Sequence, residues 1–192
     1  MAKESNFKNM TLTLFTVTLL ASASLALVYS LTEGPIADAQ AAKINNAISL
    51  VLPEFDNQPN AEQFTREVDG GILTFFPATK NGEPIGTAVQ TFTRSGYTGL
   101  IVLMVGFLPD GTIYGIEVIE HKETPGLGDK METGKSDFHV QFQGQHPDDF
   151  KLMVRKDGGD VDAIVATTIS SRAYCEAVQR AYDTLIKEGG VL

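Results

Sequence analysis

Two threonine hydroxyls stand near the C-terminus at the start of a predicted helix, where an anionic ligand is most easily held. Thr167 and Thr168 precede an apolar helical pattern that runs from about Ile169 to Lys187. The first turn of a helix presents backbone N–H groups without intrahelical acceptors, and the helix dipole is positive at that end. A phosphate joined to Thr168, or resting beside it, is therefore stabilised there. Asp162, six residues earlier, adds a carboxylate to the same segment.

A second segment whose residue types could bind a ligand follows a predicted strand and spans residues 121–128. Its two glycines permit close backbone approach to a ligand, and its threonine and glutamate offer hydrogen-bond partners. Its leucine can cover one face of a planar ring. With Met131 in place of a third glycine, the stretch does not match a dinucleotide-binding fingerprint. The predicted contacts are Glu123, Thr124, Gly126, Leu127 and Gly128.

Together the two stretches resemble the FMN-binding domains found in the G subunit of the Rnf electron-transport complex and in the C subunit of the sodium-translocating NADH:quinone reductase. Residues 121–128 are similar to the family element His-x-Glu-Thr-Pro-Gly-Leu-Gly, which lines the flavin ring pocket. Residues 162–168 resemble the family motif Asp-x-x-Ser/Thr-Gly-Ala-Thr, from which Val165, Ala166 and Thr167 depart. The length of the chain favours the Rnf subunit, and the quinone-reductase subunit is the nearest alternative.

The resemblance implies FMN as the cofactor, attached covalently through a phosphoester to Thr168, with Thr167 as a rival acceptor. It implies a separate flavin transferase that uses FAD as donor. Asp162 would be recognised by that enzyme or would bind a metal during attachment, and Lys156 would lie near the flavin. We expect no resident metal site and no catalytic side chain, because FMN carries the redox chemistry itself.

The implied function is electron relay in an ion-translocating ferredoxin:NAD oxidoreductase, with either sodium or protons as the coupled ion. A single cysteine excludes an iron–sulfur cluster held by four thiolates of this chain. The chain is therefore incomplete as a catalyst and needs other membrane subunits as partners. A flavin-free scaffold subunit is the alternative from another functional class, since the altered motif would be consistent with a degenerate site.

Composition excludes some partners and predicts the setting of the remaining thiol. The formal net charge of −9 and the pI near 4.7 argue against nucleic acid, which requires a basic surface. Cys175 falls at an apolar position of the last helix and is expected to be a buried, inert thiol. His139 and His146 lie in a polar stretch and are expected to be solvated.

An N-terminal membrane anchor is predicted from Met10 to Leu31. No residue between Lys8 and Glu33 is charged, and the 22 residues would span about 33 Å as a helix. A cleaved signal peptide is the alternative, but the apolar run continues past its small-residue segment. The bias of positive charge places residues 1–9 in the cytoplasm and the rest of the chain outside the cytoplasmic (inner) membrane.

The soluble part is expected to be an α+β domain with a mostly antiparallel sheet and packed helices. A linker helix is predicted over residues 35–52, and the FMN-binding domain over residues 53–192. Turn pairs such as Asn81-Gly82 and Asp110-Gly111 separate runs rich in Val, Ile, Thr and Phe. Strands are predicted at 72–76, 85–94, 99–108, 112–121 and 151–155. The apolar run 100–105 predicts an interior strand covered on both faces.

Overall fold

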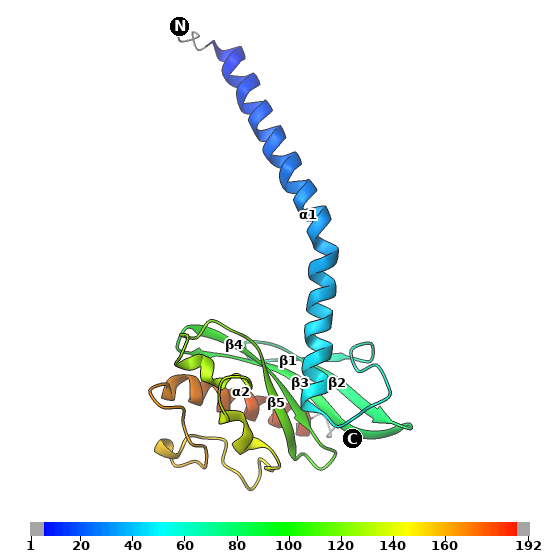
Figure 1. The fold of residues 1–192 in the computed structure, drawn as a ribbon, viewed down its shortest axis with the longest axis vertical. Coiled ribbons are helices and arrows are strands. Elements are labelled where there is room, and N and C mark those ends of the chain that lie inside the picture. Colours follow the sequence, from blue (N-terminus) through cyan, green and yellow to red (C-terminus); the bar gives the residue numbers. More distant parts are fainter. Residues whose placement is uncertain (1–5, 188–192) are drawn as a thin grey trace. The chain divides into compact units, whose positions relative to one another are not determined.

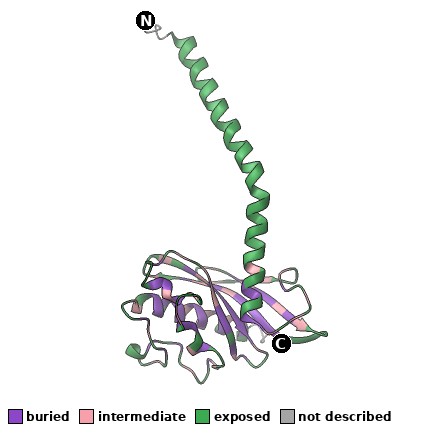
Figure 2. Ribbon diagram, in the orientation of Figure 1, coloured by how far each residue is buried: buried purple, intermediate pink, exposed green. Residues whose placement is uncertain are grey.

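The computed structural model describes residues 6–187, and it divides between Ala42 and Lys43 into two compact units. Helix α1 (Phe7–Val51) runs through the first unit and ends in the second. Residues 7–43 of this helix are exposed (Figure 2), and by length and composition α1 could cross a membrane. The predicted anchor 10–31 lies within it, whereas residues 1–5 lie outside the described part of the chain.

Helix α1 corrects one predicted boundary. A separate linker helix was expected to begin at Pro35, but α1 continues through this residue without interruption. Proline removes one backbone donor and disfavours a helix interior by about 3 kcal/mol. Four of the six residues from 37 to 42 are alanine, the strongest helix former, and they support the helix beyond the proline. The helix ends at Val51, before Pro53.

Five antiparallel strands form one sheet in the order β1-β2-β3-β4-β5, so each strand pairs with its neighbours in sequence (Figure 1). Two-residue turns at Asn81-Gly82 and Tyr97-Thr98 join β2 to β3 and β3 to β4. The strands are β1 (Phe64–Val68), β2 (Gly71–Lys80), β3 (Glu83–Gly96), β4 (Gly99–Phe107) and β5 (Ile113–His121). The predicted α+β, mostly antiparallel fold is confirmed.

Two predictions about strands need correction. Strand β1 was missed because its five residues are mostly polar and it lies at the sheet edge, where alternation is weak. The strand expected at 151–155 does not form. Val154 makes an isolated bridge to Val161, and η3 (Arg155–Asp157), a short 3₁₀ helix, follows it. The chain turns back tightly here, so its backbone pairs with its own continuation instead of the sheet.

The core lies on both faces of the sheet within the second unit. On one face, α2 (Thr168–Lys187) packs against β3 and β4, and its small and aromatic residues meet the alternating apolar residues of the strands. On the other face, the last turns of α1 cover Phe76, Ala88 and Met104. Interior strand β4 contributes to both clusters, as the unbroken apolar run 100–105 predicts.

Two short 3₁₀ helices follow β5: η1 (Gly128–Met131) contacts α2, and η2 (Phe138–Phe142) contacts β5. They overturn the expectation that His139 is solvated: it is 8% exposed, because Phe138 and Phe142 on either side of it pack into the core. His146 is half-buried, and its Nε2 lies 2.9 Å from the Asp110 carbonyl oxygen. Cys175 is buried as predicted, and burial raises the pKa of its thiol to about 12.

Candidate functional site

A tight turn delivers the chain to the start of α2. The backbone N–H of Thr167 donates to the Ile164 carbonyl (3.1 Å), and Ala166 at the third position has a φ of 66°. Val165 at the second position has no positive φ, so the turn is type II, which favours glycine at the third position because a Cβ is strained there. The Ser171 hydroxyl accepts from the Ile164 N–H (3.0 Å) and fixes the turn to the helix. The backbone geometry thus gives a physical reason for the glycine usual in the resembling motif.

Helix α2 begins at Thr168 with backbone donors directed away from the helix. Its first i to i−4 hydrogen bond runs from the Ser171 N–H to the Thr167 carbonyl (3.1 Å), so the three amides before Ser171 precede the helical ladder. Both threonines are half-buried. The Thr167 hydroxyl lies 3.5 Å from the Ile164 carbonyl, whereas the Thr168 hydroxyl has no hydrogen-bond partner within residues 6–187. The arrangement presents an uncommitted hydroxyl beside free amides, which suits a phosphate.

A cavity of about 580 Å³ opens at this helix start. Its second wall is the loop after β5, and its third is the tip of the β3–β4 hairpin. The volume falls in the range of pockets that hold small molecules and cofactors. Its lining combines hydroxyls and one carboxylate with apolar side chains and comprises Tyr97, Glu123, Thr124, Leu127, Gly128, Ala166, Thr167, Thr168, Ile169 and Ser170.

Glu123 is the charged residue of this cavity and ties its three walls together. Its Oε1 accepts from the Thr98 N–H (2.9 Å) and hydroxyl (3.0 Å), and its Oε2 accepts from the Ser170 hydroxyl (2.6 Å). Burial raises the pKa of the carboxyl, but the hydrogen bonds from Ser170 and Thr98 outweigh it, and the pKa is lowered overall. The group is therefore ionised at neutral pH.

His121 supports the loop from behind and does not line the cavity. Its Nδ1 accepts the Glu123 backbone N–H (3.0 Å), so this nitrogen carries no proton. The other ring nitrogen then donates to Glu132 Oε1 (2.6 Å), and Lys135 joins Glu132 to Asp129 through contacts of 3.0 Å. The hydrogen bond from His121 lowers the pKa of Glu132 despite its partial burial. These contacts hold the loop in place.

The structure brings six of the nine predicted site residues together in one cavity and leaves three outside it. Thr168 and Thr167 meet Glu123, Thr124, Leu127 and Gly128 in the lining. Gly126 lies in the same loop with a φ of 78°, where it serves the turn. Asp162 is exposed and pairs with Arg155 (3.0 Å). Lys156 is exposed in η3.

Four further lining residues were missed. Ile169 and Ser170 directly follow Thr168, so the predicted helix start itself could have included them. Tyr97 is distant in sequence and enters only because the β3–β4 turn reaches the helix start; no local signal marks it. Ala166 departs from the family motif, and the sequence does not predict its place in the wall.

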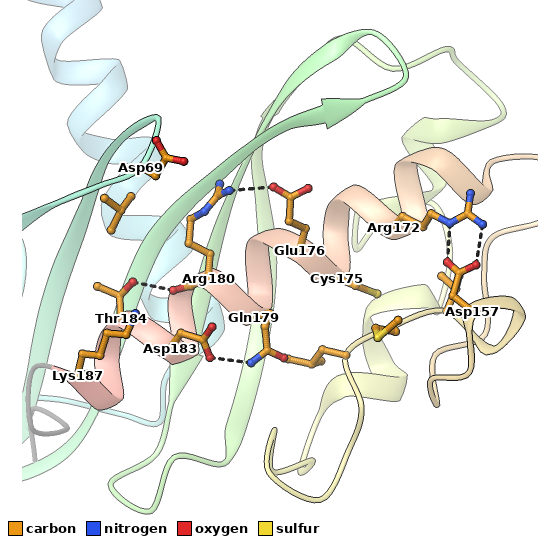
Figure 3. A pocket seen from close by; sticks show the side chains of 14 residues that line it. Asp69, Asp157, Arg172, Cys175, Glu176, Gln179, Arg180, Asp183, Thr184 and Lys187 are labelled. Carbon is orange, nitrogen blue, oxygen red and sulfur yellow. Dashed lines mark hydrogen bonds and ion pairs between the residues drawn. The ribbon is translucent and has the colours of Figure 1, made fainter.

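A larger cavity of about 860 Å³ lies along another face of α2 (Figure 3). Several of its charged side chains pair with one another. Arg172 donates two hydrogen bonds to Asp157 (2.6 and 2.8 Å), and Arg180 forms an ion pair with Glu176 (2.8 Å). Cys175 on its floor is buried with a raised thiol pKa. Because these charged side chains bond to one another, few of them remain to bind a ligand. The larger volume of this cavity therefore does not make it the functional site.

The smaller cavity fits a phosphorylated, planar ligand. The helix amides and the Thr168 hydroxyl suit the phosphate, while Leu127, Ile169 and Tyr97, which are between 41% and 69% exposed, can cover a ring. Gly128 lies against Glu123 so closely that an added Cβ would come within 2.7 Å of its Oε2, so glycine is required for this wall. Among residues 6–187 no group of three or more His, Cys, Asp or Glu could hold a metal ion.

Comparison with known families identifies the class of domain. Residues 96–183 match the family of FMN-binding domains, and this range contains the whole lining of the smaller cavity.

Comparison with individual proteins identifies the family. The chain is 39% identical over 166 residues to the G subunit of an ion-translocating oxidoreductase complex from Yersinia pestis, covering 81% of this chain and 79% of the relative. It is 38% identical over 175 residues to the corresponding protein from Pasteurella multocida, covering 84% of each. The chain belongs to the family formed by the G subunits of ion-translocating oxidoreductase complexes. A crystal structure of NqrC from Shewanella oneidensis aligns with a TM-score of 0.46 at 22% identity, covering 65% of this chain and 69% of that one.

Proposed function

We propose that this chain is an electron-transfer subunit that carries FMN in the cavity at the start of α2, bound covalently through Thr168. The observation that carries the proposal is the half-buried Thr168 hydroxyl, which has no partner within residues 6–187 and stands beside three unpaired helix amides. Membership in the G-subunit family and the match to FMN-binding domains support the same cofactor. FMN supplies one- and two-electron redox chemistry when bound.

Different residues of the cavity would bind the phosphate and the ring of such a cofactor. The amides before Ser171 and the positive end of α2 bind the phosphate. Leu127, Ile169 and Tyr97 would cover the ring and reduce its contact with water, and Thr124 would offer a hydroxyl as a hydrogen-bond partner. A tether keeps the cofactor at an effective concentration of order millimolar or above, so that dissociation into the surrounding solution does not empty the site.

Attachment requires a second enzyme. A threonine hydroxyl is a weak nucleophile without an adjacent base, and no base within residues 6–187 accepts from Thr168 Oγ1. We propose a transferase that uses FAD: the Thr168 oxygen attacks the flavin-side phosphorus, the phosphoanhydride bond breaks, AMP leaves, and the hydroxyl proton passes to the transferase. Asp162 and Lys156 lie outside the cavity and are exposed, so we assign them to contact with this enzyme.

The whole chain then acts as one relay within a membrane complex. We propose that α1 anchors it in the cytoplasmic membrane with the N-terminus inside, and that the FMN-binding domain lies on the outer side. Other subunits of the complex donate and accept the electrons and move the ion. Ferredoxin and NAD are the proposed terminal redox partners of the complex, which this chain does not bind itself.

Flavin fluorescence on a denaturing gel tests the attachment. The full chain is produced together with a flavin transferase, and we expect a band that fluoresces under ultraviolet light. Thr168→Ala should lose at least about 90% of that fluorescence, because the acceptor oxygen is gone, while the matched control Thr167→Ala should keep it. In the assembled complex, Thr168→Ala should also abolish electron flow from ferredoxin to NAD.

The outcomes separate the alternatives. A dark wild-type band would reject covalent FMN and favour a scaffold subunit. A dark Thr167→Ala band beside a fluorescent Thr168→Ala band would move the ester to Thr167. Mass spectrometry of the peptide that spans residues 156–172, with and without the mass of the attached flavin phosphate, decides between the two oxygens. Undiminished electron flow without flavin would reject the relay.

A further inference from the structure

Glu123 is a carboxylate fixed in the wall of the cavity from three directions. It is 5% exposed, and its two oxygens accept three hydrogen bonds, from the tip of the β3–β4 hairpin through Thr98 and from α2 through Ser170. The Glu123 backbone N–H is held by His121. Gly128 lies directly against the side chain, with the position of an added Cβ only 2.7 Å from both Cβ and Oε2 of Glu123. The carboxylate therefore has little freedom to move.

The charge on this carboxylate is not neutralised by a cation. Within the described chain, no lysine or arginine forms an ion pair with Glu123, and all three groups that bond to it are neutral donors. The His121 ring accepts the Glu123 backbone N–H at Nδ1 and makes no hydrogen bond to the carboxylate. Hydrogen bonds from neutral donors stabilise the ionised form without cancelling its charge. The wall thus carries one fixed negative charge.

We propose that Glu123 sets the reduction potential of the flavin in this cavity by holding one negative charge against it, an inference that rests on the proposed function. Reduction adds electrons to the ring system. A nearby carboxylate in a partly water-excluded site raises the free energy of the more negative, reduced state, and it does so more strongly than it would in bulk water. The flavin is then a stronger reductant than one in a neutral pocket.

The position of Ser170 refines the effect. Its hydroxyl lies in the first turn of α2, where the helix dipole is positive, and donates to Glu123 at 2.6 Å. The start of α2 thus contacts this carboxylate and would also hold the phosphate of the bound flavin. Loss of the Ser170 hydroxyl leaves the charge of Glu123 in place but less dispersed, so it should act on the flavin more strongly.

Glu123→Gln tests the charge with little change of shape. A glutamine can accept from Thr98 through Oε1 and donate to Ser170 Oγ through Nε2, so all three hydrogen bonds have a counterpart. The flavin-loaded full chain in detergent is titrated with dithionite against mediators, and the flavin absorbance is followed. We expect the redox equilibrium to shift about tenfold toward the reduced form, which is about 30 mV for a two-electron couple or about 59 mV for one electron.

Two control variants keep the charge and remove one donor each. Thr98→Val and Ser170→Ala should each shift the equilibrium by up to about threefold toward the oxidised form, opposite in sign to Glu123→Gln. A loaded Glu123→Gln chain with the wild-type potential would overturn the proposal. So would an upward shift of equal size in all three variants, because that would show an effect of lost hydrogen bonds and not of charge.

Failure of this inference is distinguishable from failure of the proposed function. If the wild-type protein is fluorescent and redox-active but Glu123→Gln does not change the potential, only the role of Glu123 is rejected. If the wild-type protein carries no flavin, the proposed function is rejected. Should Glu123→Gln not take up flavin, Ser170→Ala decides: a shift toward the oxidised form supports the fixed charge, and no shift or the opposite shift overturns it.

Discussion

Ala166 stands where the family motif has glycine, and its backbone adopts a conformation that favours glycine. The type II turn before α2 requires a positive φ at this position, and Ala166 adopts 66° although its Cβ disfavours it. An L-residue in the left-handed region is disfavoured by about 1–2 kcal/mol. The turn is kept because Ser171 and Thr167 bond to Ile164 on either side of it. Ala166 therefore adopts a turn conformation that glycine would adopt with less strain.

Ala166→Gly should stabilise the protein. Glycine removes the strain, and its greater freedom in the unfolded chain offsets about 0.4–1 kcal/mol of the gain. We expect the free energy of unfolding to rise by up to about 1 kcal/mol, measured by urea denaturation of the full chain in detergent with circular dichroism. Val165→Gly is the matched control, since Val165 is exposed in the same turn without positive φ. Equal loss of stability in both variants would contradict the role of strain.

At the scale of elements, three glycines of the sheet allow the end of α1 to pack closely against it. Gly106 and Gly115 are cross-strand partners in β4 and β5, and both lie against Val51. Gly86 approaches the side chain of Leu52 and the Phe107 carbonyl. A side chain at Gly106 would place its Cβ 1.7 Å from the Val51 carbonyl oxygen, so the helix end and the strand touch backbone to backbone. Glycine thus permits the second cluster of the core to form.

Gly106→Ala should therefore displace the end of α1 from the sheet. We expect the free energy of unfolding to fall by about 2–3 kcal/mol, the usual consequence of overpacking a core, with loss of protection from hydrogen exchange in residues 43–51. Gly134→Ala is the control, because nothing lies within 4 Å of its added Cβ, and it should stay within about 0.5 kcal/mol of wild type. An unchanged Gly106→Ala protein would mean that α1 does not close the core.

At the scale of the whole molecule, the two units differ in the character of their surfaces. Residues 7–43 form an exposed, mostly apolar helix (Figure 2), whereas the second unit buries its apolar residues on both faces of a sheet. An apolar helix without charge over 22 residues is stable when lipid surrounds it. The net charge of −9 resides mainly in the second unit, which suits a soluble domain.

Cysteine labelling in intact cells checks the predicted orientation. We expect Gln63→Cys to react with a membrane-impermeant maleimide and Asn6→Cys to react only after permeabilisation, because the positive-inside bias predicts an N-terminus in the cytoplasm. The wild-type chain provides the background control, since Cys175 is 2% exposed and burial raises the pKa of its thiol to about 12. The reverse pattern of labelling would place the domain in the cytoplasm.

The sequence by itself determined the elements and the two segments that form most of the candidate site. Hydrophobic alternation and turn pairs locate β2 to β5, and the helical apolar pattern locates α2, because both signals are local. The same local patterns fail at Pro35, at the edge strand β1 and at residues 151–155. In each case neighbouring residues outweighed the intrinsic preference of the segment.

The tertiary structure alone decided what meets at the cavity. Tyr97 and Thr98 reach the start of α2 because β3 and β4 pair in a register that places their turn there. Glu123 becomes a fixed, buried charge only through donors 25 residues before it and 47 after it. Burial and long-range hydrogen bonding depend on which surfaces come together. Residue type and spacing specify candidates, but packing of the sheet against α2 determines their surroundings and hence their charge.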